Sequence, residues 1–131
     1  MPRADRVPFL SGPRLIAVRA VLNEQLDVIL VADTGAQQSV ISRRVAQRLN
    51  LAHPLRLQTL VDVGRSPPVP VVRLERLRVG ASSVMGLEVC VYDLPALVGG
   101  NGLLGLEFLR HFRVTFEFDS AALVLREPKR R

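Results

Sequence analysis

The residue of this chain best suited to chemistry is an aspartate that directly follows an apolar segment. Asp33 opens the sequence Asp33-Thr34-Gly35-Ala36, and residues 28–32 before it are all apolar. Such a run is typical of a strand buried in a core, and Thr-Gly after the aspartate predicts a tight turn. A carboxylate held in this way can take up or release a proton, so the motif indicates general acid–base chemistry.

A second block, later in the chain, has the pattern apolar-apolar-Gly before a short helix. It contains Leu103, Leu104 and Gly105 and continues as Leu106-Glu107-Phe108-Leu109. Between the two blocks, residues 57–63 and 69–79 flank the Pro-rich stretch 64–68, which predicts a long hairpin. Because prolines 67, 68 and 70 lack backbone N–H donors, we expect the tip to lie at an edge or to project as an arm.

These two blocks, in this order and with a hairpin between them, resemble the single-domain retropepsin-like aspartic proteases of bacterial and cellular type. The resemblance covers roughly residues 15–126. It implies an all-β fold with one or two short helices, a closed acid-protease barrel, and a homodimer. The function it implies is that of an aspartic endopeptidase acting on extended polypeptides and inhibited by pepstatin-like compounds.

The same resemblance assigns roles to individual residues. Asp33 is expected to be catalytic, within an active-site loop that also contains Thr34, Gly35 and Ala36. The second block is expected to support this loop. The residues expected to form a flap over the substrate are Val63, Gly64, Arg65, Ser66 and Pro67.

The Asp-Thr-Gly motif occurs once, although aspartic proteolysis requires two carboxylates. We therefore expect a homodimer in which each copy contributes one Asp33. None of the other aspartates precedes Thr-Gly or Ser-Gly, which argues against a two-lobed monomer; these are Asp5, Asp27, Asp62, Asp93 and Asp119. No clear equivalent of the retroviral terminal-strand sheet is visible, so the dimer interface could use other strands, as in the ubiquitin-shuttle branch.

Two other functions are compatible with the sequence. The same fold could serve as a non-catalytic dimerisation or peptide-binding module, because Asp-Thr-Gly also occurs as an ordinary strand-to-turn sequence. The net charge of +6 and the pI of about 11.2 raise the possibility of nucleic-acid binding. The arginines are scattered, however, and the basic cluster is confined to the C-terminal residues, so no nucleic-acid partner is expected.

The composition limits the remaining possibilities. A chain of 131 residues with 48% hydrophobic residues suits one domain, and a core without Trp must be built mainly from Val and Leu. The single cysteine, Cys90, and two histidines, His53 and His111, predict no disulfide, no metal site and no cofactor. Neither a membrane-spanning stretch nor a signal peptide is visible, so we expect a cytoplasmic or unassigned location.

The expected organisation is an irregular lead-in at 1–13, the protease domain at 14–127 and a basic tail at 128–131. Strands are predicted at 15–22, 26–32, 87–92, 113–119 and 123–125, in addition to the hairpin and a short β-like segment at 39–42. Ser42 is predicted to cap a helix at 43–49 that stops at Asn50. The glycine-rich residues 99–102 are expected to form a loop, and Val114, Phe116 and Phe118 are expected to point inward.

Overall fold

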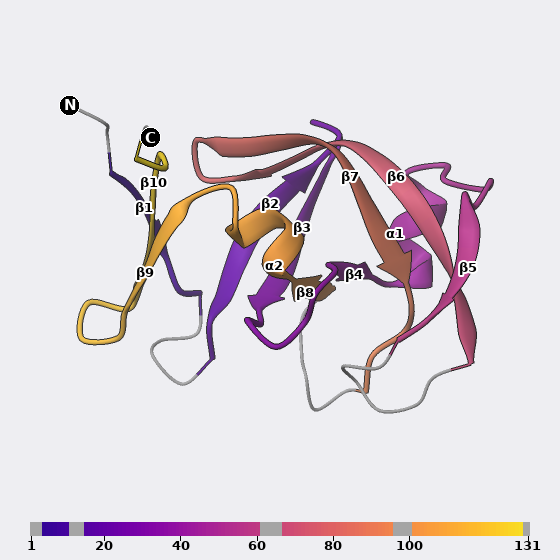
Figure 1. Ribbon diagram of the computed structural model, residues 1–131, viewed down its shortest axis with the longest axis horizontal. Coiled ribbons are helices and arrows are strands. Elements are labelled where there is room, and N and C mark those ends of the chain that lie inside the picture. Colours follow the sequence, from indigo (N-terminus) through magenta and orange to yellow (C-terminus); the bar gives the residue numbers. More distant parts are fainter. Residues whose placement is uncertain (1–3, 11–14, 61–66, 96–100, 130–131) are drawn as a thin grey trace.

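The computed structural model describes residues 4–10, 15–60, 67–95 and 101–129 (Figure 1). In this part of the chain, 52% of the residues are in strands and 9% are in helices, which confirms the predicted all-β class with one or two short helices; the structure has two. The strands are β1 (Asp5–Pro8), β2 (Ala17–Leu22), β3 (Leu26–Ala32), β4 (Val40–Ile41), β5 (Arg56–Thr59), β6 (Pro68–Val79), β7 (Ser82–Val91), β8 (Gly102–Leu104), β9 (Arg113–Glu117) and β10 (Ala122–Arg126). The helices are α1 (Arg43–Arg48) and α2 (Leu106–Leu109).

Six strands close into a barrel. The larger sheet has the order β2-β3-β8-β4-β7-β6-β5, and an additional antiparallel pairing of β2 with β6 joins the sheet back onto itself. Only β5 stays outside the ring, where it pairs with β6 alone. The predicted closed barrel is therefore confirmed, whereas the predicted homodimer stays a prediction.

The barrel core follows from alternation along the strands. In β2, Val18, Ala20 and Leu22 point inward while Arg19 is exposed, as expected where one sheet face is buried. The same core receives Leu30 from β3 and Phe108 from α2, both fully buried. Val and Leu dominate the buried set, so a chain with few aromatic residues fills its core with aliphatic side chains.

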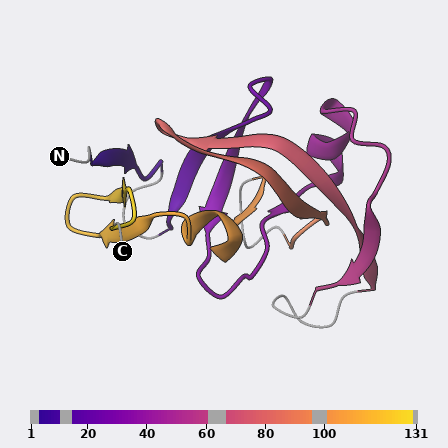
Figure 2. The same ribbon diagram turned by 45° about the horizontal axis from the view of Figure 1, so that its top comes forward.

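A second sheet, with the order β1-β10-β9, lies at one end of the molecule, and β5 lies at the other end (Figures 1 and 2). The prediction of an irregular lead-in is wrong for Asp5–Pro8, because this segment pairs antiparallel with β10, with Asp5 opposite Leu125. The sequence around Asp5 does not reveal this strand, since its partner comes from the far end of the chain. The Asp5 carboxylate also accepts hydrogen bonds from the Ala81 N–H (2.9 Å) and the Ser82 hydroxyl (2.5 Å).

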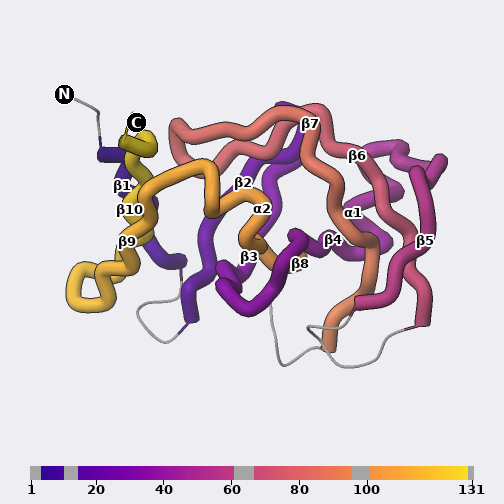
Figure 3. Tube along the Cα trace, viewed as in Figure 1, coloured from indigo at the N-terminus to yellow at the C-terminus, as the bar shows by residue number. Residues whose placement is uncertain are grey.

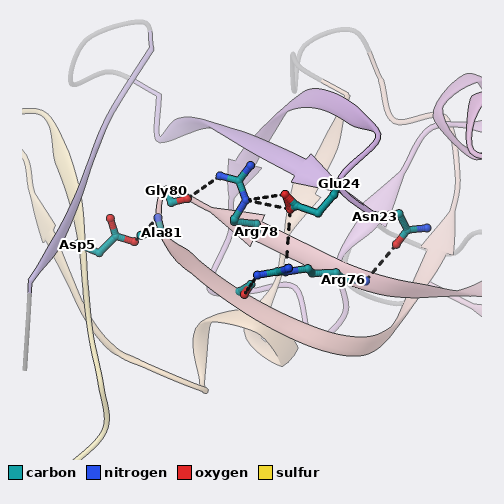
Figure 4. Close-up of polar contacts among 8 residues, drawn as sticks. Asp5, Asn23, Glu24, Arg76, Arg78, Gly80 and Ala81 are labelled. Carbon is teal, nitrogen blue, oxygen red and sulfur yellow. Dashed lines mark hydrogen bonds and ion pairs between the residues drawn. The ribbon is translucent and has the colours of Figure 1, made fainter.

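The turn between β2 and β3 is fixed by polar contacts with β6 (Figure 4). Asn23 and Glu24 have φ angles of 53° and 52°, which leave their side chains facing β6. The Asn23 amide oxygen accepts the Arg76 N–H at 3.1 Å, and the Glu24 carboxylate accepts from Arg78 Nε at 3.0 and 3.1 Å. These contacts hold the hairpin that leads to Asp33 against the longest strand of the barrel.

Several local predictions can be compared with the structure. The strand at 26–32 is β3 with the predicted bounds, and the Ser42 hydroxyl caps α1 by accepting the Val45 N–H at 3.2 Å. The strand predicted at 87–92 begins earlier, at Ser82, and Gly102 lies in strand β8 rather than in a loop. Phe118 was expected inside but is 54% exposed, because β9 ends at Glu117 and Phe118 starts the turn into β10.

Candidate active site

Asp33 lies where β3 ends, between two neighbouring strands. β3 pairs antiparallel with β2 and parallel with β8, and Ala32 stands opposite Leu104. The Asp33 N–H continues this parallel pairing by donating to the Leu104 carbonyl at 3.0 Å. Asp33 is partly buried, while Thr34 and Gly35 after it are exposed. The barrel therefore presents one carboxylate at the end of a buried strand, as the sequence predicts.

The turn after Asp33 orients its carboxylate. The Gly35 N–H donates to Asp33 Oδ1 at 2.8 Å, and the Ala36 N–H donates to the Asp33 carbonyl at 3.2 Å. A Cβ atom at Gly35 would lie 3.2 Å from Oδ1, so glycine leaves room for the carboxylate to turn back onto the loop. Ala36 is buried beneath the turn.

The loop at 33–39 is fastened to the second block by backbone hydrogen bonds. The Leu106 N–H donates to the Ala36 carbonyl at 2.8 Å, and the Glu107 N–H donates to the Gln37 carbonyl at 3.1 Å. The approach is so close that a Cβ atom at Gly105 would lie 2.6 Å from the Gln38 carbonyl carbon. In the structure, therefore, Gly105 stands against the loop that it was predicted to support, and only glycine fits there.

Two side chains complete this junction, Ser39 and Glu107, and neither is predictable as a functional residue from the sequence. The fully buried Ser39 accepts the Gly105 N–H through its hydroxyl at 2.9 Å. The Ser39 N–H in turn donates to the Glu107 carboxylate. Burial is the main reason why the pKa of Glu107 rises to about 7. Serine and glutamate are common residues, so their presence near the two glycine motifs does not predict a role. Their role becomes visible only from the contact between them in the structure.

A separate apolar layer lies beneath the loop and extends to the hairpin. Leu103 of the second block belongs to it, together with buried residues from β3, β4, β6 and β7; its members are Ala17, Val31, Ala36, Val40, Leu60, Val69, Val71, Cys90 and Leu103. Leu104 instead faces the main core. Leu103 thus packs in the layer beneath the loop and Leu104 packs in the main core, so the block is buried on both sides.

The hairpin that was predicted to carry a flap consists of β5 and β6 in antiparallel register, with Leu57 opposite Pro70 (Figure 3). Four of the predicted flap residues, Val63, Gly64, Arg65 and Ser66, lie outside the described residues, and the fifth, Pro67, is exposed just before β6. The Val71 carbonyl accepts the Leu55 N–H, so the backbone polar groups of Val71 point toward this side of the hairpin. Because these groups alternate in direction along a strand, those of residues 68 and 70 point away from β5. The prolines therefore remove no donor from the β5–β6 ladder.

A polar contact joins this hairpin to the loop. The Gln58 side chain of β5 donates to the amide oxygen of Gln38, and the Cys90 thiol lies 3.4 Å from the same oxygen. Burial raises the pKa of the Cys90 thiol to about 11, which keeps the thiol protonated as a donor. Gln38 and Gln58 did not stand out in the sequence, because single glutamines carry no pattern.

The described residues offer neither a metal site nor a membrane-spanning helix. No cluster of three or more His, Cys, Asp or Glu side chains is arranged to hold a metal ion there. Within the same residues, no helix has the length and apolar character needed to cross a bilayer. His53 lies between α1 and β5, and His111 lies just after α2.

Comparisons with known proteins concern the family and the fold. The model of a family described as gag-polyprotein putative aspartyl protease matches residues 18–111, which include both Asp33 and Gly105. A retropepsin-like aspartic protease from Rickettsia conorii is similar in structure, with a TM-score of 0.72 and 18% identity over 97% of this chain and 92% of that chain. The retroviral protease-like domain of Ddi1 from Leishmania major gives 0.59 and 18% over 87% and 92%. No curated protein matches the sequence.

Proposed function

The chain belongs to the gag-polyprotein putative aspartyl protease family, and on this premise we propose that it is an aspartic endopeptidase. The proposed reaction is the hydrolysis of peptide bonds in extended polypeptides by a water molecule. The observation that carries the proposal is the placement of Asp33, which is partly exposed at the end of a buried strand with its carboxylate oriented by the Gly35 N–H. A group held in this way can exchange protons with a bound water.

The proposed catalytic unit is a pair of Asp33 carboxylates, one from each of two copies of the chain. Two carboxylates at close range cannot both ionise, so the pair shares one proton. The ionised carboxylate takes a proton from water while the water oxygen attacks the peptide carbonyl, and the protonated carboxyl donates to the carbonyl oxygen. Return of a proton to the amide nitrogen then breaks the C–N bond, without a covalent intermediate.

The rest of the loop has supporting roles in this proposal. Thr34 is exposed beside Asp33, where its hydroxyl can bond to the corresponding loop of the second copy. Gly35 permits the two loops to approach closely, since it has no side chain. Leu103, Leu104 and Gly105 hold each loop in place from behind. A homodimer is part of the proposal, because a single copy supplies only one Asp-Thr-Gly motif.

The β5–β6 hairpin is proposed to cover the bound substrate as a flap. It contacts the loop through Gln58 and Gln38, so a substrate at Asp33 would lie close to it. An extended peptide can then bind by strand addition, with main-chain hydrogen bonds and side chains that alternate between pockets. Val63, Gly64, Arg65, Ser66 and Pro67 are the residues proposed to close over it.

The experiment is to compare Asp33→Asn with Asp27→Asn, a matched change at an exposed position on the same strand. We expect Asp33→Asn to reduce cleavage of an unfolded protein substrate by about 10³-fold or more, and Asp27→Asn to leave it unchanged. Pepstatin should block the parent protein, and sedimentation should show a dimer. Cleavage that survives Asp33→Asn would end the proposal. Peptide binding without cleavage by the parent protein would favour a non-catalytic binding module instead.

A further inference from the structure

A pocket of about 450 Å³ lies between α1 and the β5–β6 hairpin. α1 lies beside this hairpin in Figure 1. The pocket is lined by Ala46 on the helix, Leu51 after it, Pro70 and Val72 on β6, and Val91 at the end of β7. This volume falls in the range of small-molecule sites, which are mostly apolar with a few polar groups. None of these residues belongs to the loop at 33–39 or to the block that supports it, although Pro70 and Val72 lie on β6 of the proposed flap hairpin.

The pocket wall carries one charged side chain, Arg43. Its backbone N–H donates to the Asp93 carboxylate at 2.9 Å, which fixes the residue at the start of α1. Among the described residues, no carboxylate is paired with its guanidinium group. The two remaining polar side chains, Gln47 and Asn50, are neutral and exposed. The pocket therefore combines an apolar interior with an uncompensated cation at its rim.

A second groove of about 370 Å³ shows why this combination matters. It is lined by three arginines, Arg6, Arg19 and Arg78. Two of the three are already neutralised, Arg6 by Glu117 at 2.7 Å and Arg78 by Glu24 at 3.0 Å. An anion would have to compete with these carboxylates for Arg6 and Arg78, whereas Arg19 has no carboxylate partner among the described residues. At Arg43 no such competition exists within the described residues.

We propose that the pocket beside α1 binds a small carboxylate with an apolar chain. The chain would lie between Leu51 and Val72, and the carboxylate would accept charge-assisted hydrogen bonds from the Arg43 guanidinium. Leu57 faces Pro70 across the hairpin and is 64% exposed, so the apolar surface continues beyond the pocket and can take a longer chain. Since Pro70 and Val72 belong to β6, the occupant contacts the hairpin directly.

The test is a titration of the methyl-labelled protein with decanoate, followed by NMR. We expect the methyl signals of Val72 and Val91 to shift and to saturate. Arg43→Gln should weaken binding about tenfold or more, as expected for the loss of hydrogen bonds to a charged group, whereas Arg44→Gln, on the same helix but outside the pocket, should not. Decanol should bind equally to the parent protein and to Arg43→Gln.

A parallel titration with N-acetyl-leucyl-phenylalanine distinguishes a peptide C-terminus from a fatty acid as the source of the carboxylate. Binding of either compound that depends on Arg43 supports the proposal and identifies its source. The proposal is overturned if neither compound shifts Val72 or Val91 at millimolar concentration. It is also overturned if Arg44→Gln weakens binding as much as Arg43→Gln, or if the shifts are confined to Val21 in the second groove.

Discussion

The loop at 33–39 and the β5–β6 hairpin are held to the barrel in different ways. The loop is fixed by backbone hydrogen bonds to Leu104, Leu106 and Glu107 and by the buried Ser39 hydroxyl. In the hairpin, β6 belongs to the closed ring, while β5 lies outside it as a four-residue strand that pairs with β6 alone within the described residues. Among the described residues, Gln58 of the hairpin donates to Gln38 of the loop, and the apolar side chains of Leu60, Val69 and Val71 pack in the layer beneath the loop.

This difference suits the proposed activity. A reacting carboxylate must keep its position to within a fraction of an ångström, which requires a loop whose backbone groups are satisfied by rigid neighbours. A cover must let an extended substrate enter and leave, so its contacts need to be fewer and replaceable. Changes on the loop side should therefore disturb stability and activity together, and changes on the hairpin side should act on substrate binding.

The largest effect is expected from Gly105→Ala. The new Cβ atom would lie 2.6 Å from the Gln38 carbonyl carbon, so the loop would have to move away from α2. We expect the free energy of unfolding to fall by about 3 kcal/mol and cleavage to become undetectable. Gly35→Ala is the matched control for stability alone, because its Cβ atom would meet Asp33 Oδ1, at 3.2 Å, and no backbone atom. Equal urea midpoints for Gly105→Ala and the parent would contradict the close-packed junction.

A smaller loss is expected for Ser39→Ala, which tests the polar half of the same junction. The change removes the acceptor of the Gly105 N–H in a fully buried position, and an unsatisfied buried donor lowers stability by about 2 kcal/mol. Ser42→Ala, which removes the cap of α1, should lower the stability by about 1 kcal/mol without changing cleavage. Urea denaturation and peptide cleavage of both variants check this; equal activity in the two would show that the junction does not position Asp33.

These two regions also show how far the sequence could be interpreted. β3 and Asp33 were predictable because an apolar run, an aspartate and a Thr-Gly turn are adjacent in the chain. β8 was not predicted as a strand, because it has only three residues and begins with a glycine; it is a strand only through its pairing with β3 and β4. β1 was also not predicted, because it is a strand only through its pairing with β10, which is distant in sequence.

The partners of the loop could not be predicted either. Glu107 was part of the second block, but the bond from the Ser39 N–H depends on two turns meeting in space. Likewise, Gln38 and Gln58 come from the loop and the hairpin, and their pairing follows from the register of the barrel. Motifs formed by residues that are adjacent in the chain can be predicted from the sequence. Contacts between segments that are distant in the chain are visible only in the structure.

The raised pKa of Glu107 predicts that the stability of the folded protein depends on pH. Burial and the nearby Glu88 raise its pKa from 4.5 to about 7, against the opposing effects of Ser39 and Arg110. The folded protein therefore holds this proton more tightly than the unfolded chain does, so stability falls as the pH rises from about 4.5 to above 7. Because the side chain is only partly buried, we expect a loss of roughly 1–2 kcal/mol.

The check is to measure the unfolding free energy of Glu107→Gln and of the parent protein between pH 4 and 8. The amide keeps an acceptor for the Ser39 N–H but does not ionise, so the difference between the two proteins should grow in favour of the variant as the pH rises. Glu75→Gln, on β6, serves as a control for removing one carboxylate. Parallel curves for Glu107→Gln and the parent would show that this carboxyl titrates normally.

The smallest effect is expected on the hairpin side, from Gln58→Ala. It removes the donor to the Gln38 amide oxygen, which keeps the Cys90 thiol at 3.4 Å, and it removes the acceptor of the Arg56 guanidinium at 3.3 Å. The loss of these partly exposed hydrogen bonds lowers stability by about 1 kcal/mol or less. Because Asp33 and its backbone partners are untouched, we expect KM for a peptide substrate to rise a few-fold with kcat nearly unchanged. Gln47→Ala on α1 is the matched control and should alter neither constant. A fall in kcat without a change in KM would contradict this prediction. It would show that the hairpin, through Gln58, orients the reacting carboxylate and does not hold the substrate.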